Sequence, residues 1–283
     1  MAVTRTITLA GRTVPALGIG TWGLGEGSTA QSEAELASLR LGLDHGLQVI
    51  DTAEMYGDGA AETLVGQAIQ GRARDQLVLI SKFYPWHATA RKMRVALEAS
   101  LRRLGTDYLD LYLLHWRGNT PLRETLTGLQ ALQQAGLIRA YGVSNFDVAD
   151  LQDALALPGG AQLAANEVLY NLTARGIEVD LCATHAAHGL TTIGYSPFNS
   201  GRGTSIHLPR AVHALARAKG LSDHQLMLAW TLRDQVLSIP KAASPAHMQA
   251  DLAAQAVTWT APELAQIEAA FPRPSHKVPL QMI

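Results

Sequence analysis

The feature that most constrains the fold of this chain is a regular alternation between short apolar runs and longer amphipathic stretches. Eight runs are rich in Leu, Ile, Val and Ala and are bounded by Gly, Pro or polar residues, which is typical of parallel strands covered on both faces. They are Ala16–Thr21, Leu47–Thr52, Leu77–Lys82, Leu109–His115, Ile138–Ser144, Leu163–Val168, Thr191–Ser196 and Val236–Lys241. Parallel strands that follow one another need a crossover between them, most often a helix.

The stretches between the runs have the spacing and the end signals of such helices. Apolar side chains recur every three or four residues in Ser32–His45 and in Ala90–Leu104. Capping boxes predict helix starts at Ser222 with Gln225 and at Thr260 with Glu263. Glycines predict helix ends at Gly46, Gly105, Gly136 and Gly220.

Eight strand–helix units in a chain of 283 residues predict one α/β domain, a (β/α)8 TIM barrel spanning residues 1–283, rather than two domains. No linker rich in Ser, Gly or Pro divides the sequence. Ahead of the first barrel strand, Thr4–Leu9 and Arg12–Pro15 flank Gly11 and predict a β-hairpin. We expect this hairpin to close the floor of the barrel.

The charge balance and the cysteine content narrow the class of function. With 23 Lys and Arg against 24 Asp and Glu, the net charge of −1 offers no bulk attraction for nucleic acid or for anionic membranes. The lone cysteine, Cys182, cannot form an intramolecular disulfide. No apolar run approaches the ~20 residues of a membrane helix, and Met1–Leu9 lacks the pattern of a secretory leader. We therefore expect a cytoplasmic, monomeric protein that acts on a small molecule.

Polar residues stand at the C-terminal end of nearly every predicted strand. They are Thr21-Trp22, Asp51, Lys82, His115, Ser144-Asn145, Glu167, Tyr195-Ser196 and Lys241. A (β/α)8 barrel carries its catalytic groups at this end of its strands. Each residue alone has a structural explanation, such as a solvated charge or a turn, but together they predict an active site. Tyr56, five residues after Asp51, lies on a loop that can reach the same face.

Four of these side chains could together protonate a carbonyl oxygen. Tyrosine, with a pKa of ~10, is a poor acid near neutral pH. Lys82 beside Tyr56 would lower that pKa, and Asp51 behind the lysine would keep the ammonium charged and positioned. His115 adds a second donor, so the group could hold and protonate a carbonyl oxygen while hydride reaches the carbon. None of the four can supply hydride, which points to a nicotinamide cofactor.

One glycine pattern suggests a different nucleotide site. Gly18-Ile-Gly-Thr-Trp-Gly23 matches G-x-G-x-x-G, which binds dinucleotides only when its third glycine lies inside a starting helix. The following Leu24-Gly-Glu-Gly-Ser28 disfavours a helix. We therefore interpret the match as chance and the segment as a loop that brings Trp22 to the mouth of the barrel.

Several motifs together resemble the aldo-keto reductase superfamily. They are Asp51-Thr-Ala-Glu-Met-Tyr56-Gly57, Lys82 at a strand end, Leu114-His115-Trp116, Gly142-Val-Ser-Asn-Phe146, Gly194-Tyr-Ser-Pro-Phe198 and Ile239-Pro-Lys241. They follow the family's order over essentially the whole chain. Two further segments, Ser81-Lys-Phe-Tyr-Pro-Trp86 and Pro240-Lys-Ala-Ala243, resemble in particular the bacterial members that reduce methylglyoxal and related aldehydes.

The resemblance implies a catalytic tetrad of Asp51, Tyr56, Lys82 and His115, with Tyr56 as the acid, and an NADPH molecule extended across the barrel mouth. The implied contacts are Thr21 and Trp22 beside the nicotinamide ribose, Ser144 and Asn145 on the carboxamide, and Tyr195 stacked on the ring. Ser196, Phe198 and the segment with Gly201, Arg202 and Gly203 would run beside the pyrophosphate, and Lys241 would contact the phosphate on the adenosine ribose.

Three positions depart from the family pattern. Glu167 stands where glutamine is usual, and because an ionised carboxylate only accepts hydrogen bonds, we expect it to receive the carboxamide NH₂. Ala242 and His247 stand where members often carry a serine and an arginine that grips the 2′-phosphate, so discrimination for that phosphate should weaken. Together with Asp251, these two residues complete the predicted cofactor contacts.

The residues together with the family resemblance imply NADPH-dependent reduction of aldehydes or dicarbonyls, such as methylglyoxal or aromatic aldehydes. Trp22, Trp86 and Trp116 would form an apolar slot for the substrate. One alternative is a regulatory subunit on the same fold that senses NADPH with little turnover.

A second alternative is a metal-dependent barrel hydrolase that uses Asp51, His115 and Glu167 as ligands. Against it, Lys82 would be a competing cation among those ligands, and the sequence has no His-x-His pair. We therefore expect no metal.

Overall fold

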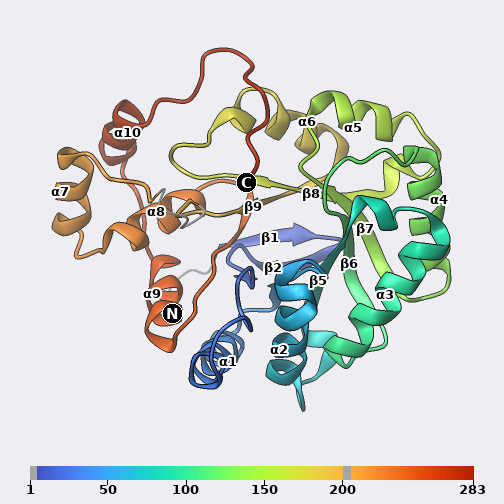
Figure 1. Ribbon diagram of the computed structural model, residues 1–283. Helices are drawn as coiled ribbons and strands as arrows, with labels where there is room; N and C mark the ends of the chain where they lie inside the picture. The colour runs from blue at the N-terminus through green and yellow to red at the C-terminus, as the bar shows by residue number, and fades with distance from the viewer. Residues whose placement is uncertain (1–4, 200–204) are drawn as a thin grey trace.

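The computed structural model describes residues 5–199 and 205–283. In this part of the chain, eight strands form one parallel sheet in the order β10-β9-β8-β7-β6-β5-β4-β3. Their bounds are β3 (Ile19–Gly20), β4 (Val49–Asp51), β5 (Val78–Phe83), β6 (Leu109–Leu114), β7 (Ile138–Ser144), β8 (Leu163–Leu169), β9 (Thr191–Tyr195) and β10 (Val236–Ile239). Parallel bridges join Leu17 to Ser238 and Gly20 to Lys241, so the sheet closes on itself (Figure 1).

Helices alternate with these strands and surround the barrel (Figure 1). They are α1 (Thr29–Asp44), α2 (Ala60–Ile69), α3 (Ala90–Leu104), α4 (Leu122–Gln134), α5 (Val148–Leu155), α6 (Leu181–His188), α7 (Arg210–Ala218), α8 (Asp223–Thr231), α9 (Pro245–Ala254) and α10 (Ala261–Ala270). The predicted (β/α)8 barrel is confirmed. So are the capping boxes that begin α8 and α10.

The floor of the barrel is an antiparallel hairpin of β1 (Thr6–Leu9) and β2 (Arg12–Pro15), as predicted. Ile7, Leu9 and Val14 are buried in the same apolar cluster as the residues that fill the barrel interior. Thr191 Oγ1 donates to the carbonyl oxygen of Thr8 over 2.7 Å. The hairpin therefore plugs the end of the barrel at which the strands begin, and it leaves the opposite end for the site.

Some element bounds differ from the predicted ones. α1 begins at Thr29, three residues before the predicted Ser32, because the Ser28 side chain accepts a hydrogen bond from the Gln31 N–H and caps the helix. A Cβ at Gly20 would lie 2.5 Å from the carbonyl oxygen of Ile239. This glycine therefore allows β3 to approach β10 closely, which agrees with a chance match to the dinucleotide pattern.

Candidate active site

Strand alternation brings the predicted site residues to one end of the barrel. Val49, Ile80, Leu113, Ala165 and Ile193 lie in the cluster that fills the barrel interior. Side chains two residues apart on a strand share a face. The next interior positions toward the C-terminal end are therefore Asp51, Lys82, His115, Glu167 and Tyr195. The barrel interior is therefore filled by apolar side chains, and a layer of polar, mostly ionisable side chains lies at the C-terminal ends of the strands.

Lys82 is the centre of this polar layer and is fully buried. Its Nζ donates to Asp51 Oδ1 over 2.6 Å, to Tyr56 Oη over 3.0 Å and to the carbonyl oxygen of Thr52 over 3.2 Å. Glu167 Oε1 lies 3.3 Å from the same nitrogen. The predicted association of Asp51, Lys82 and Tyr56 is therefore present in the structure.

Tyr56 begins the short turn η1 (Tyr56–Gly59) after β4, and its phenol keeps its proton at neutral pH. Burial raises the pKa of Tyr56 above its ordinary value, and the Lys82 ammonium opposes that rise only in part. Lys82 thus acts on this pKa in the predicted direction, but burial outweighs it, and the net shift is upward. The phenol therefore holds a proton that it can donate, and the neighbouring Lys82 ammonium would stabilise a phenolate.

His115 is neutral in this environment. Burial, and secondarily the Lys82 ammonium, lower the pKa of His115 to about 2. Its Nδ1 is buried and has no hydrogen-bond partner in the described part of the chain. The imidazole packs edge-on to Tyr56, with ring centroids 5.8 Å apart. A neutral imidazole has one donor and one acceptor nitrogen, so His115 can give one hydrogen bond but is not a source of protons.

Glu167 adds a second carboxyl group beside the tetrad and is 2 % exposed. No donor among residues 5–199 and 205–283 reaches its Oε2 atom. Burial, and then the neighbouring Asp51, raise the pKa of Glu167 well above its usual range. Although burial alone would lower the pKa of Lys82, Asp51 and Glu167 together raise it, so the ammonium stays charged.

One hydrogen-bond network joins the C-terminal ends of β6, β7, β8 and β9. The Tyr195 hydroxyl donates to Asn145 Oδ1 over 2.8 Å, and Asn145 Nδ2 donates to the His115 carbonyl and to Ser144 Oγ, each over 3.1 Å. Ser144 Oγ donates to the Glu167 carbonyl over 3.0 Å. Asn145 has a φ of +60°, a conformation that non-glycine residues seldom adopt and that functional sites often hold.

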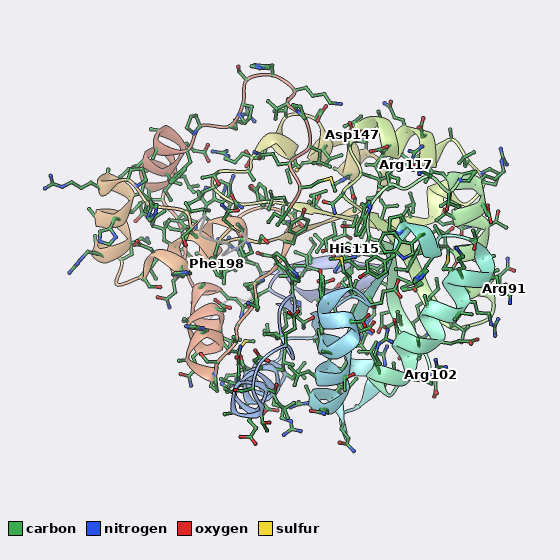
Figure 2. The ribbon with its side chains drawn as sticks, in the orientation of Figure 1. Arg91, Arg102, His115, Arg117, Asp147 and Phe198 are labelled. Atoms are coloured by element: carbon green, nitrogen blue, oxygen red, sulfur yellow. The ribbon has the colours of Figure 1, made fainter. Side chains whose placement is uncertain are left out.

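A cavity of about 390 Å³ opens above this layer. The predicted residues that line it are Thr21, Trp22, Asp51, Tyr56, His115, Asn145, Glu167, Tyr195, Ser196, Phe198 and Lys241. Figure 2 shows His115 near the centre of the molecule and Phe198 on the side formed by α7, α8 and α9. The predicted Gly201, Arg202 and Gly203 lie outside the described residues.

Other predicted site residues lie away from the cavity lining. Lys82 and Ser144 are buried beneath it, and Ala242 is buried just before α9. His247 and Asp251 are on α9, where burial raises the pKa of Asp251 to about 7. The cofactor contacts of Ala242, His247 and Asp251 stay predictions.

Of the three tryptophans assigned to the substrate, Trp22 lines the cavity, whereas Trp86 and Trp116 are not among its lining residues. The Trp116 ring contacts His115 and Trp86, with centroids 5.0 Å and 5.9 Å away, and Tyr84 stacks on Trp86 at 4.2 Å. Trp86 is 55 % exposed. Tyr84, Trp86 and Trp116 therefore form an aromatic cluster that extends outward from His115. The roles of Trp86 and Trp116 toward substrate stay predictions.

Several lining residues do not follow from the sequence motifs. Asp223, His224 and Met227 enter from α8, and Ile283 enters from the end of the chain. None of them follows a strand, so the rule that sites lie at strand ends does not indicate them. Met55 also lines the cavity, and its position next to Tyr56 in the tetrad loop is a signal that could have identified it.

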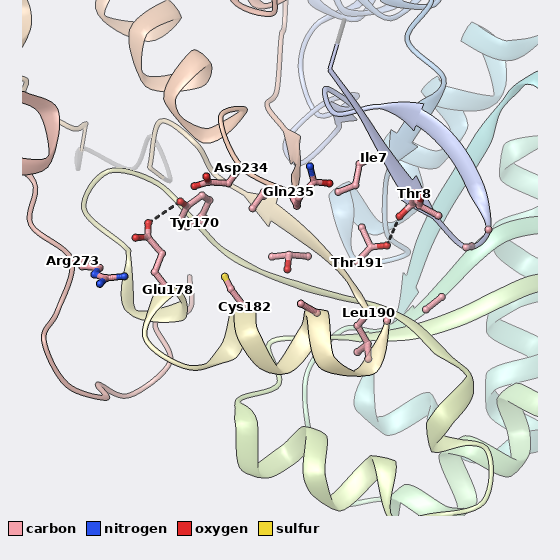
Figure 3. Close-up of a pocket in the computed structure, with 17 residues that line it drawn as sticks. Ile7, Thr8, Tyr170, Glu178, Cys182, Leu190, Thr191, Asp234, Gln235 and Arg273 are labelled. Atoms are coloured by element: carbon pink, nitrogen blue, oxygen red, sulfur yellow. Dashed lines mark hydrogen bonds between the residues drawn. The ribbon is translucent and has the colours of Figure 1, made fainter. Parts of the chain in front are cut away.

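A second cavity, of about 720 Å³, lies at the hairpin end of the barrel (Figure 3). Burial raises the pKa of its Cys182 thiol to about 12, so that thiol is not a nucleophile near neutral pH. Glu178 pairs with Arg175 at 2.6 Å and accepts a hydrogen bond from Tyr170 over 2.8 Å. These groups are satisfied by the protein itself, in contrast to the orphaned polar atoms near Lys82.

The described residues contain no group of three or more His, Cys, Asp or Glu side chains arranged to hold a metal ion. Asp51 and Glu167 both face Lys82 Nζ, which takes the position that a metal bound by these carboxylates would need. Among the helices of residues 5–199 and 205–283, none has both the length and the apolar character required to cross a bilayer.

Known proteins of one family are similar to this chain over nearly its whole length. The Aldo/keto reductase family profile matches residues 16–271. Methylglyoxal reductase YeaE of Escherichia coli (strain K12) is 46% identical over 273 residues, which cover 95% of each chain. An aldo-keto reductase of Mycolicibacterium vanbaalenii is 34% identical over 254 residues, 87% of this chain and 86% of the relative.

A solved structure agrees at the level of the fold. The crystal structure of an aldo-keto reductase from Klebsiella pneumoniae in complex with NADPH has a TM-score of 0.95 and 47% sequence identity, covering 99% of this chain and 100% of that chain. The chain described here belongs to the aldo/keto reductase family, and it is therefore an oxidoreductase. The family resemblance of the motifs is confirmed, and neither the hydrolase nor the regulatory alternative is favoured.

Proposed function

We propose that this protein reduces aldehydes and dicarbonyls, including methylglyoxal and aromatic aldehydes, to alcohols with NADPH. The observation that carries the proposal is the chain of contacts from Asp51 through Lys82 to Tyr56, of 2.6 Å and 3.0 Å, at the base of a cavity. The similarity to a protein named methylglyoxal reductase and to a reductase crystallised with NADPH supports it.

The residues around the cavity fit a nicotinamide group. Glu167 presents a buried oxygen without a hydrogen-bond partner among the described residues, and a carboxamide, which has both a donor and an acceptor group, can supply that partner. Asn145 lines the cavity and is hydrogen-bonded to the buried Ser144, and the proposal places the carboxamide at this pair. The Tyr195 ring offers a surface for stacking. The proposal includes Thr21 and Trp22 beside the nicotinamide ribose, since both line the same cavity.

The four tetrad residues share the work of moving one proton. NADPH, when bound, supplies the hydride that adds to the carbonyl carbon. Tyr56 gives its phenolic proton to the carbonyl oxygen, and the Lys82 ammonium stabilises the phenolate left behind. Asp51 holds Lys82 in place, and the neutral His115 donates a hydrogen bond to the same carbonyl oxygen. One hydride and one proton together convert the carbonyl group to an alcohol.

The far end of the cofactor would extend toward α8 and α9. Ser196 and Phe198 line that part of the cavity, and the proposal places the pyrophosphate beside them and beside Gly201 and Arg202. Lys241 is exposed at the mouth and would bind the 2′-phosphate as a point charge.

Neither Ala242 nor His247 supplies the bidentate guanidinium that strengthens phosphate recognition. The preference for NADPH over NADH should therefore be moderate. His247 and Asp251 would contact the adenosine part from α9. Trp22, with Trp86 and Trp116 of the aromatic cluster, would accept small or aromatic aldehydes. We also propose that the protein is a monomer and acts in the cytoplasm.

The experiment that tests this function is cofactor oxidation followed by nicotinamide absorbance. Purified protein is mixed with NADPH and with methylglyoxal or a panel of aromatic aldehydes, and NADH replaces NADPH in a parallel series. Turnover on these carbonyls with NADPH is the expected result. Tight NADPH binding without turnover on any carbonyl would instead favour the regulatory subunit.

A further inference from the structure

The base of the cavity holds two carboxyl groups for one ammonium. Asp51 Oδ1 lies 2.6 Å and Glu167 Oε1 lies 3.3 Å from Lys82 Nζ, and none of the three side chains is more than 3% exposed. If both carboxyl groups were ionised, the site would carry an uncompensated negative charge away from water, which is strongly unfavourable.

The remaining groups that face Glu167 do not compensate this charge. Tyr56 and Tyr195 are phenols whose pKa values burial raises, and His115 is a neutral imidazole. The other titratable groups lining the cavity are Asp223, His224 and Lys241. Of these, Lys241 is exposed at the mouth. Among the described residues, Lys82 is thus the buried cation available to Glu167.

The structure favours Glu167 over Asp51 as the carboxyl that carries a proton. Asp51 has the shorter contact with the ammonium, and an ion pair favours the charged form of its carboxyl. Glu167 Oε2 receives no donor from the described residues, so it lacks a hydrogen bond that would stabilise the charged carboxylate. The high pKa of Glu167, raised by burial and by Asp51, agrees with this assignment.

We propose that Glu167 keeps this proton in the free enzyme and beside the neutral, reduced nicotinamide, and releases it to solvent when the positively charged, oxidised nicotinamide is bound. In balanced form, the protonated Glu167 and NADP⁺ give the Glu167 carboxylate with bound NADP⁺ and one free proton. Glu167 therefore makes the preference between NADP⁺ and NADPH depend on pH. The inference rests on the proposed function, because it requires the nicotinamide to occupy the cavity that Glu167 lines.

The chain offers a matched variant for this proposal. Glu167→Gln keeps the size and shape of the side chain and stays neutral at every pH, like the protonated carboxyl, but it has no proton to release. Its amide can still meet the carboxamide and Lys82. We therefore expect Glu167→Gln to bind both forms of the cofactor, with a preference between them that does not change with pH.

The test counts the protons released when the full chain binds each cofactor. Calorimetric titrations with NADP⁺ and with NADPH are run in two buffers of different ionisation enthalpy, from about pH 6.5 to 9. Both cofactors carry the same phosphates, so phosphate titration cancels in the comparison. The wild type should release up to one proton more with NADP⁺ than with NADPH. Its ratio Kd(NADPH)/Kd(NADP⁺) should rise by up to about tenfold per pH unit.

Each contrary result has its own meaning. Equal proton counts for the two cofactors in the wild type would overturn the proposal, and this measurement requires no variant to fold. A difference that persists in folded Glu167→Gln would overturn the assignment to Glu167. If neither NADP⁺ nor NADPH bound, the proposed cofactor would be wrong and this inference with it, whereas binding of both with equal counts would contradict the inference alone.

Discussion

The carboxylate of Asp51 and the ammonium of Lys82 lie 2.6 Å apart, with side chains 3% and 0% exposed. The desolvation of such a pair offsets much of its attraction, so it adds little net stability, but removing one partner leaves an uncompensated charge. We infer that the main contribution of the pair is geometric. It fixes Lys82 Nζ at 3.0 Å from Tyr56 Oη, where the ammonium can act on the phenol.

Asp51 and Glu167 are expected to substitute for one another in balancing Lys82. Glu167→Gln alone should change the unfolding free energy little, and Asp51→Asn alone should be partly rescued because Glu167 can ionise. The double variant should lose about 3–5 kcal/mol, since it leaves Lys82 without a carboxylate. Urea denaturation of the wild type, the two single variants and the double variant gives the coupling free energy between Asp51 and Glu167. Strict additivity of the two single effects would contradict this account.

Lys241 is expected to discriminate between NADPH and NADH. Lys241→Ala removes a charge that would bind the 2′-phosphate, so the NADPH Kd should rise by about tenfold or more while the NADH Kd stays nearly constant. Fluorescence titration with both cofactors measures the change. Lys277→Ala, which removes a 52% exposed lysine paired with Asp180, is the control. Equal effects of Lys241→Ala on both cofactors would remove the 2′-phosphate contact from the proposal.

Asp251 is expected to destabilise the protein as the pH rises. Burial raises the pKa of Asp251 from 3.8 to about 7, so the native state favours the neutral carboxyl. The stability contributed by this neutral carboxyl is fully present below pH 3.8 and is lost as the pH rises toward 7. Asp251→Asn should therefore gain stability over the wild type by up to about 1.4 kcal/mol per pH unit across that window.

Denaturation of the cofactor-free protein at the acid and alkaline ends of this range checks the sign. Asp107→Asn, at an exposed position, provides the comparison. A difference between Asp251→Asn and wild type that is independent of pH would show that this carboxyl is not neutral in the native state.

The hairpin is expected to be part of the core. Leu9 is fully buried inside the barrel floor, so Leu9→Ala should lower the unfolding free energy by about 2–5 kcal/mol. Thr6→Ala, at an exposed position of the same strand, should have a small effect. Similar unfolding free energies for the two variants would mean that the hairpin does not plug the barrel.

Strand residues made much of this structure predictable. Apolar runs that end in Asp51, Lys82 and His115 predict both a parallel barrel and the convergence of these side chains. Alternate residues of a strand face the same side, so neighbouring residues alone show which side chains point into the barrel. The start of α1 at Thr29 was missed because it depends on a weak cap from Ser28.

Properties that depend on the whole fold were not accessible in the same way. The direction of the Tyr56 pKa shift depends on how far burial exceeds the effect of Lys82, and no spacing rule gives that balance. Asp223 and Ile283 reach the cavity from a helix and from the end of the chain, far in sequence from any motif.

The most direct test of the account is the turnover of Tyr56→Phe with NADPH and methylglyoxal. The matched control is Tyr112→Phe. Tyr112 is buried away from the cavity lining, and its hydroxyl has no hydrogen-bond partner among the described residues. We predict that Tyr56→Phe loses about 10²–10⁴-fold in kcat with little change in the NADPH Kd, while Tyr112→Phe keeps near wild-type turnover. Wild-type turnover by Tyr56→Phe would contradict the assignment of Tyr56 as the proton donor.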